Sequence, residues 1–312
     1  MKKISIVISV YNEQGNIVRL LDEIEKYKNS NYSYEIILVD DGSDDGSVEI
    51  IKKLCASNKE LKLLSFTRNY GHEVAMSAGM DLASGDAVIF MDADLQHPPE
   101  TVATMIGYWE KGNRIVLTKR IENASNTFTY KVMSHIFYKV LNYLSDYNMQ
   151  SNTPDFRLID RYYIEMLKRY KESSRLFRGL LYLIDSKDDT VIIDFIAPER
   201  FSGESKYHFI KLFNLAIDSI LAFSIKPLRI ALIASSVVFV LSIFYGLFLL
   251  IYWLTIGVSL DGFMTQVLLI IIFGSANLFV LSVIGEYVGR IHIESKRRPL
   301  YTIKELINFN SV

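Results

Sequence analysis

Short apolar runs alternate with segments of helical periodicity along the first part of the chain. The runs are rich in Ile, Val and Leu and predict strands at residues 4–10, 34–39, 61–66, 86–92 and 114–118. Between them, apolar residues recur at helical spacing and predict helices at residues 17–24, 47–54, 73–82 and 99–109. This alternation is typical of an α/β fold in which helices cover both faces of a mostly parallel sheet.

The pattern continues less regularly to residue 206 and then changes. Apolar stripes predict helices at 128–144 and 162–170, and a β-like segment follows at 191–196. Residues 207–225 carry an apolar face and a polar face at helical spacing, which favours an interfacial helix lying on a membrane surface.

Two long segments near the C-terminus have no charged residue. Residues 230–256 and 263–285 each exceed the roughly 20 residues needed to cross the hydrocarbon core of a bilayer. Basic residues flank the outer ends of both, and the connecting loop contains only Asp261 as a charge. This asymmetry predicts that the N-terminal domain and the C-terminal tail lie in the cytoplasm. Spans without ionisable residues argue against a channel or a pump.

These shifts predict four parts in the 312 residues: a cytoplasmic domain at 1–206, an interfacial helix at 207–226, a two-span hairpin at 229–286 and a cytoplasmic tail at 287–312. The formal net charge of −1 gives no indication of nucleic-acid binding. The single cysteine, Cys55, excludes an internal disulfide and is typical of a reducing compartment.

The chemistry-bearing stretch follows the fourth predicted strand. Asp92 and Asp94 are two residues apart, so they can face one point at the end of the strand, and Gln96 follows in the turn. Carboxylate and amide oxygens are the ligands that Mg²⁺ and Mn²⁺ prefer. The alternative for a lone Asp-x-Asp is an ordinary polar turn.

Polar clusters also follow the first two predicted strands. Tyr11 and Glu13 come after the first, and Asp40 and Asp41 after the second. Ligands of such sheets bind at the carboxyl ends of the strands, so these clusters share one edge with the acidic turn. Helix capping is the structural alternative for Tyr11 and Glu13, and a turn before a helix for one of the two aspartates.

Several motifs together resemble glycosyltransferase family two, whose members have the GT-A fold, in its polyprenyl-phosphate branch (undecaprenyl-phosphate glucosyltransferase and dolichol-phosphate mannose synthase). They are Ser9-Val-Tyr-Asn-Glu13, Val39-Asp-Asp-Gly-Ser43, Met91-Asp-Ala-Asp-Leu-Gln-His-Pro-Pro-Glu100, Asp155-Phe-Arg-Leu-Ile-Asp-Arg161 and Arg200…Gly203-Glu-Ser-Lys-Tyr207. The resemblance includes the two C-terminal spans. It implies an inverting, metal-dependent transferase that moves a hexose from a nucleotide-sugar to undecaprenyl phosphate at the cytoplasmic membrane, and a homotetramer.

The resemblance also implies roles for individual residues. The nucleotide-sugar positions are Val10, Tyr11, Glu13, Asp40, Asp41 and Asp92, and the metal positions are Asp92, Asp94 and Gln96. The catalytic positions are Asp94, Asp155 and Arg200, and the acceptor-phosphate positions are Lys131, Arg200 and Lys206. Because residues 115–120 depart from the family pattern, it stays open whether Lys119 or Arg120 meets the acceptor phosphate.

Simpler readings exist for the basic and histidine positions. Lys131 can be a solvated helix charge, and Arg200 and Lys206 can bind anionic lipid. His72 and His97 are expected to be ordinary polar loop residues. The resemblance favours a UDP-sugar donor. The rivals are use of GDP-mannose, a processive polysaccharide synthase, and a non-catalytic membrane-anchored partner that binds nucleotide-sugars.

Overall fold

The computed structural model describes residues 1–121, 153–170, 181, 184, 188–198, 224, 226–256 and 262–309. The chain forms two compact units: unit 1 contains residues 1–138, 149–209 and 298–312, and unit 2 contains residues 139–148 and 210–297. Lys131, Arg200 and Lys206 lie outside the described residues, as does nearly all of the predicted interfacial helix.

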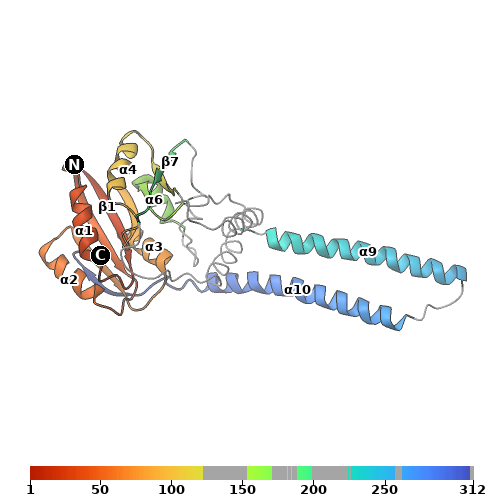
Figure 1. Ribbon diagram of the computed structural model, residues 1–312. Coiled ribbons are helices and arrows are strands. Elements are labelled where there is room, and N and C mark those ends of the chain that lie inside the picture. Colours follow the sequence, from red (N-terminus) through yellow and green to blue (C-terminus); the bar gives the residue numbers. More distant parts are fainter. Residues whose placement is uncertain are drawn as a thin grey trace. The chain divides into compact units, whose positions relative to one another are not determined.

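Unit 1 is built on one sheet flanked by helices (Figure 1). Its strands are β1 (Lys2–Val10), β2 (Tyr32–Asp40), β3 (Leu61–Phe66), β4 (Ala87–Asp92), β5 (Ile115–Arg120), β6 (Arg157–Asp160), β7 (Thr190–Phe195) and β8 (Ile303–Ile307). Its helices are α1 (Ile17–Lys26), α2 (Ser47–Ser57), α3 (His72–Leu82), α4 (Glu100–Glu110) and α6 (Arg161–Leu167). The five strands and four helices expected before residue 120 are all present, with ends that differ by a few residues.

The described strands follow the order β7-β5-β6-β4-β1-β2-β3-β8. Neighbours β1–β2, β1–β4, β2–β3 and β5–β7 are parallel, whereas β6 and β8 run antiparallel to their partners. The predicted α/β fold with a mostly parallel sheet is therefore confirmed. The hydropathy pattern does not predict β6 or β8, because both strands are short.

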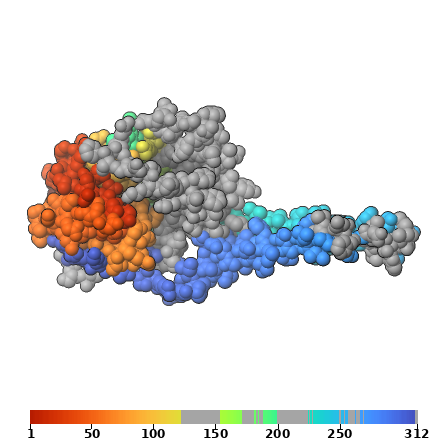
Figure 2. All heavy atoms as spheres, turned by 60° about the horizontal axis from the view of Figure 1, so that its bottom comes forward, coloured from red at the N-terminus to blue at the C-terminus, as the bar shows by residue number. Residues whose placement is uncertain are grey.

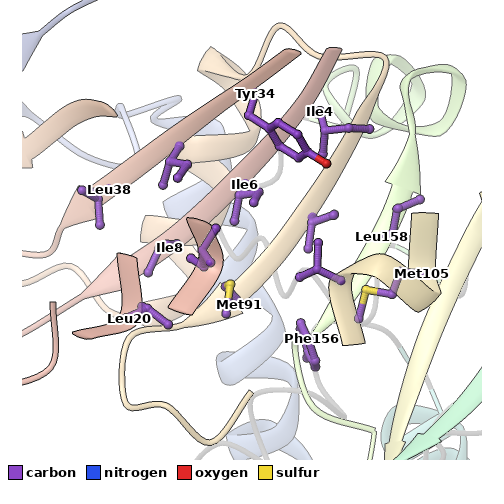
Figure 3. Close-up of a cluster of buried hydrophobic side chains, with 14 of the residues drawn as sticks. Ile4, Ile6, Ile8, Leu20, Tyr34, Leu38, Met91, Met105, Phe156 and Leu158 are labelled. Carbon is purple, nitrogen blue, oxygen red and sulfur yellow. The ribbon is translucent and has the colours of Figure 1, made fainter. Parts of the chain in front are cut away.

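Side-chain alternation along the strands divides the core between the two faces of the sheet. Ile4, Ile6 and Ile8 of β1 belong to a cluster with apolar residues of α1, α2 and α4, and Figure 3 shows Leu20 and Met105 facing this side. On the other face α3 approaches closely, because a Cβ at Gly79 would lie 3.1 Å from Val39 Cγ2. Burial on both faces explains why these strands read as continuous apolar runs.

The last described strand joins two parts of the sequence that are far apart. β8 follows unit 2 in the chain and pairs antiparallel with β3, so Leu63 lies opposite Ile307. In Figure 2, dark blue atoms from the end of the chain lie beside orange atoms of the N-terminal part. The chain therefore leaves unit 1, forms unit 2 and returns to complete the edge of the sheet.

Unit 2 contains two long apolar helices, α9 (Lys226–Ile256) and α10 (Phe263–Ser295). By length and composition, the segments Leu228–Phe248 and Leu269–Ser295 are each sufficient to cross a membrane. Their apolar side chains are largely exposed in the isolated chain, as lipid-facing residues would be. Within unit 2 the Tyr287 hydroxyl donates to the carbonyl of Ser224 at 2.7 Å.

Candidate active site at the carboxyl edge of the sheet

Register places the predicted site residues at one edge of the sheet. Ser9 of β1 lies opposite Asp92 of β4, and Val10 lies opposite Asp40 of β2. In the antiparallel pair of β4 and β6, Phe90 lies opposite Arg157. Two residues further along, this register brings Asp155 beside Asp92, so residues distant in sequence meet at the end of β4.

Asp92 has one oxygen that receives no hydrogen bond from the described residues. Its Oδ1 is buried and has no hydrogen-bond partner, although the side chain as a whole is 36% exposed. A buried acceptor without a partner costs free energy, so such an atom in a native fold needs an explanation. One explanation is a ligand that binds there.

Asp94 follows in a turn with unusual backbone geometry. It is largely buried, and its Oδ1 accepts the backbone N–H of Gln96 at 3.1 Å. The next residue, Leu95, has φ = 63°, a left-handed conformation that side chains other than glycine seldom adopt. Strain of this kind is typical of functional turns.

His72 lies between two of the carboxylates. It is the first residue of α3, and its Nε2 is 3.5 Å from Asp92 Oδ1 and 3.6 Å from Asp155 Oδ2. Its Nδ1 is 3.0 Å from the Ser9 hydroxyl. Burial lowers the pKa of His72, but Asp92 and Asp155 outweigh burial and raise it to about 9. His72 is therefore part of the site rather than an ordinary loop residue.

His97 supports Asp92 from the other side. Its Nδ1 accepts the backbone N–H of Asp92 at 2.9 Å, so the neutral ring carries its proton on Nε2, which lies 3.7 Å from Asp92 Oδ2. The ring stacks on Phe156 with centroids 4.7 Å apart. Burial lowers the pKa of His97 despite the surrounding carboxylates, which favours the neutral form. His97 thus fixes the acidic turn through one backbone contact and one side-chain contact.

Asp155 is held by a cation. Asp155 and Arg157 are both largely buried and form an ion pair in which Arg157 Nη2 donates to Asp155 Oδ1. A carboxylate paired with a guanidinium is stabilised in its ionised form. Arg157 therefore holds the Asp155 carboxylate in a fixed position beside Asp92.

The two aspartates after β2 brace loops. Asp40 accepts the N–H of Ser43 at 3.0 Å and the hydroxyl of Ser65 at 2.7 Å. Asp41 accepts the N–H groups of Tyr70 and Gly71 at 2.6 Å and 2.9 Å. Burial raises the pKa of Asp41, although these two amides oppose the shift. Both residues are almost fully buried, so each carboxylate has a structural task, and contact with a nucleoside stays a prediction.

Tyr11 and Glu13 follow β1 and lie before α1. Tyr11 is 37% exposed at the surface of this edge. Glu13 shapes the start of α1, because its carbonyl accepts the N–H of Asn16 at 2.9 Å and its carboxylate accepts the Asn16 amide at 2.6 Å. Val10 is buried, and its carbonyl accepts the N–H of Asp41 at 2.9 Å.

Two exposed basic residues end β5 at the same edge. β5 runs in the same direction as β4, because each is antiparallel to β6, so Lys119 and Arg120 lie at the carboxyl edge. The structure places both there and does not choose between them as a phosphate contact.

The residues present fit a hard divalent cation. Among the described residues, no group of three or more His, Cys, Asp and Glu is arranged to hold a metal. Mg²⁺ is usually held by one or two carboxylates together with waters and substrate phosphates, so a complete protein cage is not required. Asp94 and Asp92, whose Oδ1 receives no hydrogen bond from the described residues, provide this type of donor set.

Comparison with known proteins identifies relatives across the whole chain. The family model for Glycosyl transferase family 2 matches residues 5–167. The chain is 37% identical to the bactoprenol glucosyl transferase of Shigella phage SfV, over 97% of this chain and 98% of that protein. It is 36% identical to the prophage bactoprenol glucosyl transferase homolog of Escherichia coli, over 97% and 99%.

The fold is also similar to a solved enzyme. Glucosyl-3-phosphoglycerate synthase from Mycobacterium tuberculosis, crystallised with Mn²⁺, UDP and glucosyl-3-phosphoglycerate, gives a TM-score of 0.53 at 19% identity. The match covers 70% of this chain and 78% of that one. At this identity the likeness concerns the fold.

Proposed function

We propose that this chain, which belongs to glycosyl transferase family 2, transfers a hexose from a nucleotide-sugar to undecaprenyl phosphate. It is a glycosyltransferase with the GT-A fold. The proposal for the acceptor is supported by the bactoprenol glucosyl transferases, which match the chain over nearly its full length. The observation that carries the proposal for the site is the buried Asp92 Oδ1 beside Asp94 at the carboxyl edge, which receives no hydrogen bond from the described residues.

The donor is proposed to lie along the carboxyl ends of β1, β2 and β4. Val10, Tyr11, Asp40 and Asp41 flank the nucleoside, and Glu13 shapes the turn beside it. Asp92 and Asp94, with Gln96, would hold Mg²⁺ or Mn²⁺, which when bound supplies positive charge to the departing nucleotide diphosphate.

The side chains around this position orient the reacting groups. His97 and His72 fix Asp92 from two sides, and Arg157 fixes Asp155. A lipid monophosphate is already anionic near neutral pH, so it needs countercharge rather than a general base. A direct attack on the anomeric carbon breaks its bond to the diphosphate and inverts its configuration, so an α-linked donor gives a β-linked product.

Basic residues are proposed to supply the countercharge. Lys119 or Arg120 lies at the correct edge of the sheet, whereas Lys131, Arg200 and Lys206 are proposed from the sequence resemblance. Bringing the acceptor phosphate close to the donor diphosphate requires such cations, and fixing the two reactants in line can lower the barrier by several kcal/mol.

The enzyme is proposed to be a multi-pass protein of the cytoplasmic membrane with its catalytic domain in the cytoplasm. α9 and α10 are long and apolar enough to span, and Arg290, Lys296, Arg297 and Arg298 follow or end the second of them. The return of β8 to the sheet of unit 1 requires an even number of crossings, in agreement with two spans. A homotetramer remains a proposal from the resemblance.

A reconstitution experiment tests this function. The full chain in nanodiscs is incubated with undecaprenyl phosphate and labelled UDP-glucose, UDP-N-acetylglucosamine, UDP-galactose or GDP-mannose, with and without a chelator. We expect transfer from a UDP-sugar that stops on chelation and returns with Mn²⁺ or Mg²⁺. Two variants accompany the wild type: Asp92→Asn is expected to lose most of its activity, and the matched control Glu25→Gln, on the exposed surface of α1, is expected to stay active.

The alternatives give different results. Transfer from GDP-mannose alone would replace the UDP-sugar assignment, and transfer that persists in chelator would remove the metal. Nucleotide-sugar binding without transfer to any lipid phosphate would identify a non-catalytic partner.

A further inference from the structure

The segment that returns from unit 2 contacts a loop that leads directly to the candidate active site. Thr67–Gly71, here called the β3–α3 loop, connects β3 to His72 at the start of α3. Asp41 accepts two N–H groups of this loop, and His72 lies beside Asp92 and Asp155. The position of the loop therefore affects both the proposed nucleoside contact and the proposed metal site.

Tyr301 and Thr302, just before β8, hold the first half of the loop. The Tyr301 ring stacks on Phe66, with centroids 4.9 Å apart and planes at 26°. Phe66 in turn contacts the Tyr70 ring edge-on at 5.6 Å. The Thr67 N–H donates to the Thr302 carbonyl at 3.1 Å. Hydrogen bonds from Thr302, then from Thr67 and Arg68, lower the pKa of Tyr70 to about 8.

The second half of the loop is fixed from β2. A Cβ at Gly42, which has φ = 73°, would lie 2.7 Å from the backbone nitrogen of Asn69, so the loop passes directly over this glycine. With Asp41 bound to Tyr70 and Gly71, the loop is held between the β2 turn on one side and the returning segment on the other.

The pairing of β8 with β3 is irregular where it meets this loop. Ser65 lies opposite Glu305 and Phe66 opposite Ile303, so one extra residue of β8 is accommodated between these pairs. Bulges commonly re-aim side chains beside functional sites. Here the bulge lies at the Tyr301 end of β8 and not at its far end.

We propose that Tyr301 and Thr302 are positioning residues for the donor half of the catalytic centre. By holding the β3–α3 loop, the segment that returns from the second apolar helix keeps the Tyr70 and Gly71 amides on Asp41 and keeps His72 in place. The returning segment is thus part of the scaffold of the active site as well as an edge of the sheet. The identification of this half of the centre as the donor site rests on the proposed function, whereas the effect of Tyr301 and Thr302 on the loop does not.

The far end of β8 provides a matched control. The Asn308 amide donates to the carbonyls of Cys55 and Leu61 at 2.7 Å and 2.8 Å, and Lys59 donates to its Oδ1 at 3.1 Å. None of these partners belongs to the β3–α3 loop. Asn308→Ala therefore loosens the same strand at the end away from the site.

The experiment compares Tyr301→Ala, Tyr301→Phe and Asn308→Ala in the full chain in nanodiscs. Hydrogen exchange of the Tyr70 and Gly71 amides is measured together with thermal stability, and then the Kd for UDP with Mn²⁺. Because an aromatic pair contributes free energy beyond its burial, Tyr301→Ala is expected to speed exchange at these amides by about fivefold or more. The Kd of this variant for UDP is expected to rise as well. Tyr301→Phe is expected to restore both the exchange rates and the Kd to the wild-type values.

Asn308→Ala is expected to lower the melting temperature while exchange at Tyr70 and Gly71 and the Kd stay at the wild-type values. Equal changes in the two alanine variants, or unchanged exchange in Tyr301→Ala, would overturn the proposal. If the wild type fails to bind UDP, the donor assignment fails, and the exchange comparison still decides the role of Tyr301.

Discussion

Two carboxylates lie at opposite ends of the same sheet, and their surroundings differ. Glu35 lies opposite Ser5 near the amino ends of the strands, and Asp92 lies opposite Ser9 at the carboxyl ends. The Ser5 hydroxyl donates to Glu35 at 2.5 Å, whereas the Ser9 hydroxyl contacts His72 rather than Asp92. Of these two serines on β1, Ser5 therefore donates to the neighbouring carboxylate, whereas Ser9 contacts the histidine beside it.

Glu35 is fully provided with partners. Besides Ser5, its oxygens receive the Ser84 N–H at 2.7 Å, the Lys62 ammonium at 2.6 Å and the Lys3 ammonium at 2.9 Å. Burial raises the pKa of Glu35, but these donors outweigh it and lower the pKa to about 2. Glu35 is therefore the centre of a structural ion-pair cluster.

Asp92 has the opposite character. Its Oδ1 is buried and lacks a hydrogen-bond partner, and the groups around it include two further acidic residues and two histidines. The fold gives Glu35 four donors, whereas the described residues give the buried Oδ1 of Asp92 only the longer contact with His72 at 3.5 Å, which leaves room for a ligand there. The contrast supports the proposal of a ligand site at Asp92.

The largest expected effect is at Asp92. Asp92→Asn keeps the shape of the side chain and removes its charge, so turnover should fall on the order of 10³-fold, as when a group that stabilises transition-state charge is lost. Steady-state transfer assays and a thermal melt of the same preparation measure this. Loss of folding equal to the loss of turnover would show that Asp92 is structural.

The next effect is on stability at the other end of the sheet. Glu35→Gln leaves the ammonium groups of Lys3 and Lys62 without their carboxylate partner. The free energy of unfolding should therefore fall by about 3 kcal/mol. For a chain of this size the melting temperature should then fall by roughly 6–12 °C. Transfer per folded molecule should be unchanged. Glu25→Gln serves as the control, because Glu25 also pairs with a lysine, Lys28, but its side chain is 65% exposed.

Acid should weaken the Glu35 cluster in a defined window. The folded-state pKa of Glu35 is about 2, below its ordinary value of 4.5, so its contribution to stability is complete above about pH 4.5 and is lost as the pH falls towards 2. The difference in melting temperature between the wild type and Glu35→Gln should narrow over this range. A constant difference would place the stabilising interaction elsewhere.

A smaller effect is expected at His72. Both neighbours of its Nε2 are carboxylate oxygens, so this nitrogen must carry a hydrogen that faces Asp92 and Asp155. His72→Leu removes that donor, and residues that orient metal ligands typically change affinity or activity by about 10–100-fold. The Mn²⁺ concentration for half-maximal transfer should rise, and His72→Gln, which retains an amide donor, should recover part of it. Equal behaviour of the two variants would contradict this role.

Much of unit 1 can be predicted from local pattern. The strands β1 to β5, the helices between them and the acidic turn at Asp92 and Asp94 follow from periodicity and from the polar residues at strand ends. The two apolar helices of unit 2 follow from length and the absence of charge. The sequence offers one indication that His72 belongs to the candidate site: it starts the helix that follows β3, at the carboxyl edge of the sheet.

By itself the sequence determined where the chain forms strands and helices, which segments can span a bilayer, and which carboxylates follow β4, because these properties depend on neighbouring residues. Tertiary structure decided that the pairing of β6 with β4 brings Asp155 beside Asp92, that His72 lies between two carboxylates, and that β8 closes the sheet beside β3. Such pairings join residues far apart in the chain. They depend on the packing of whole elements, which no local pattern records.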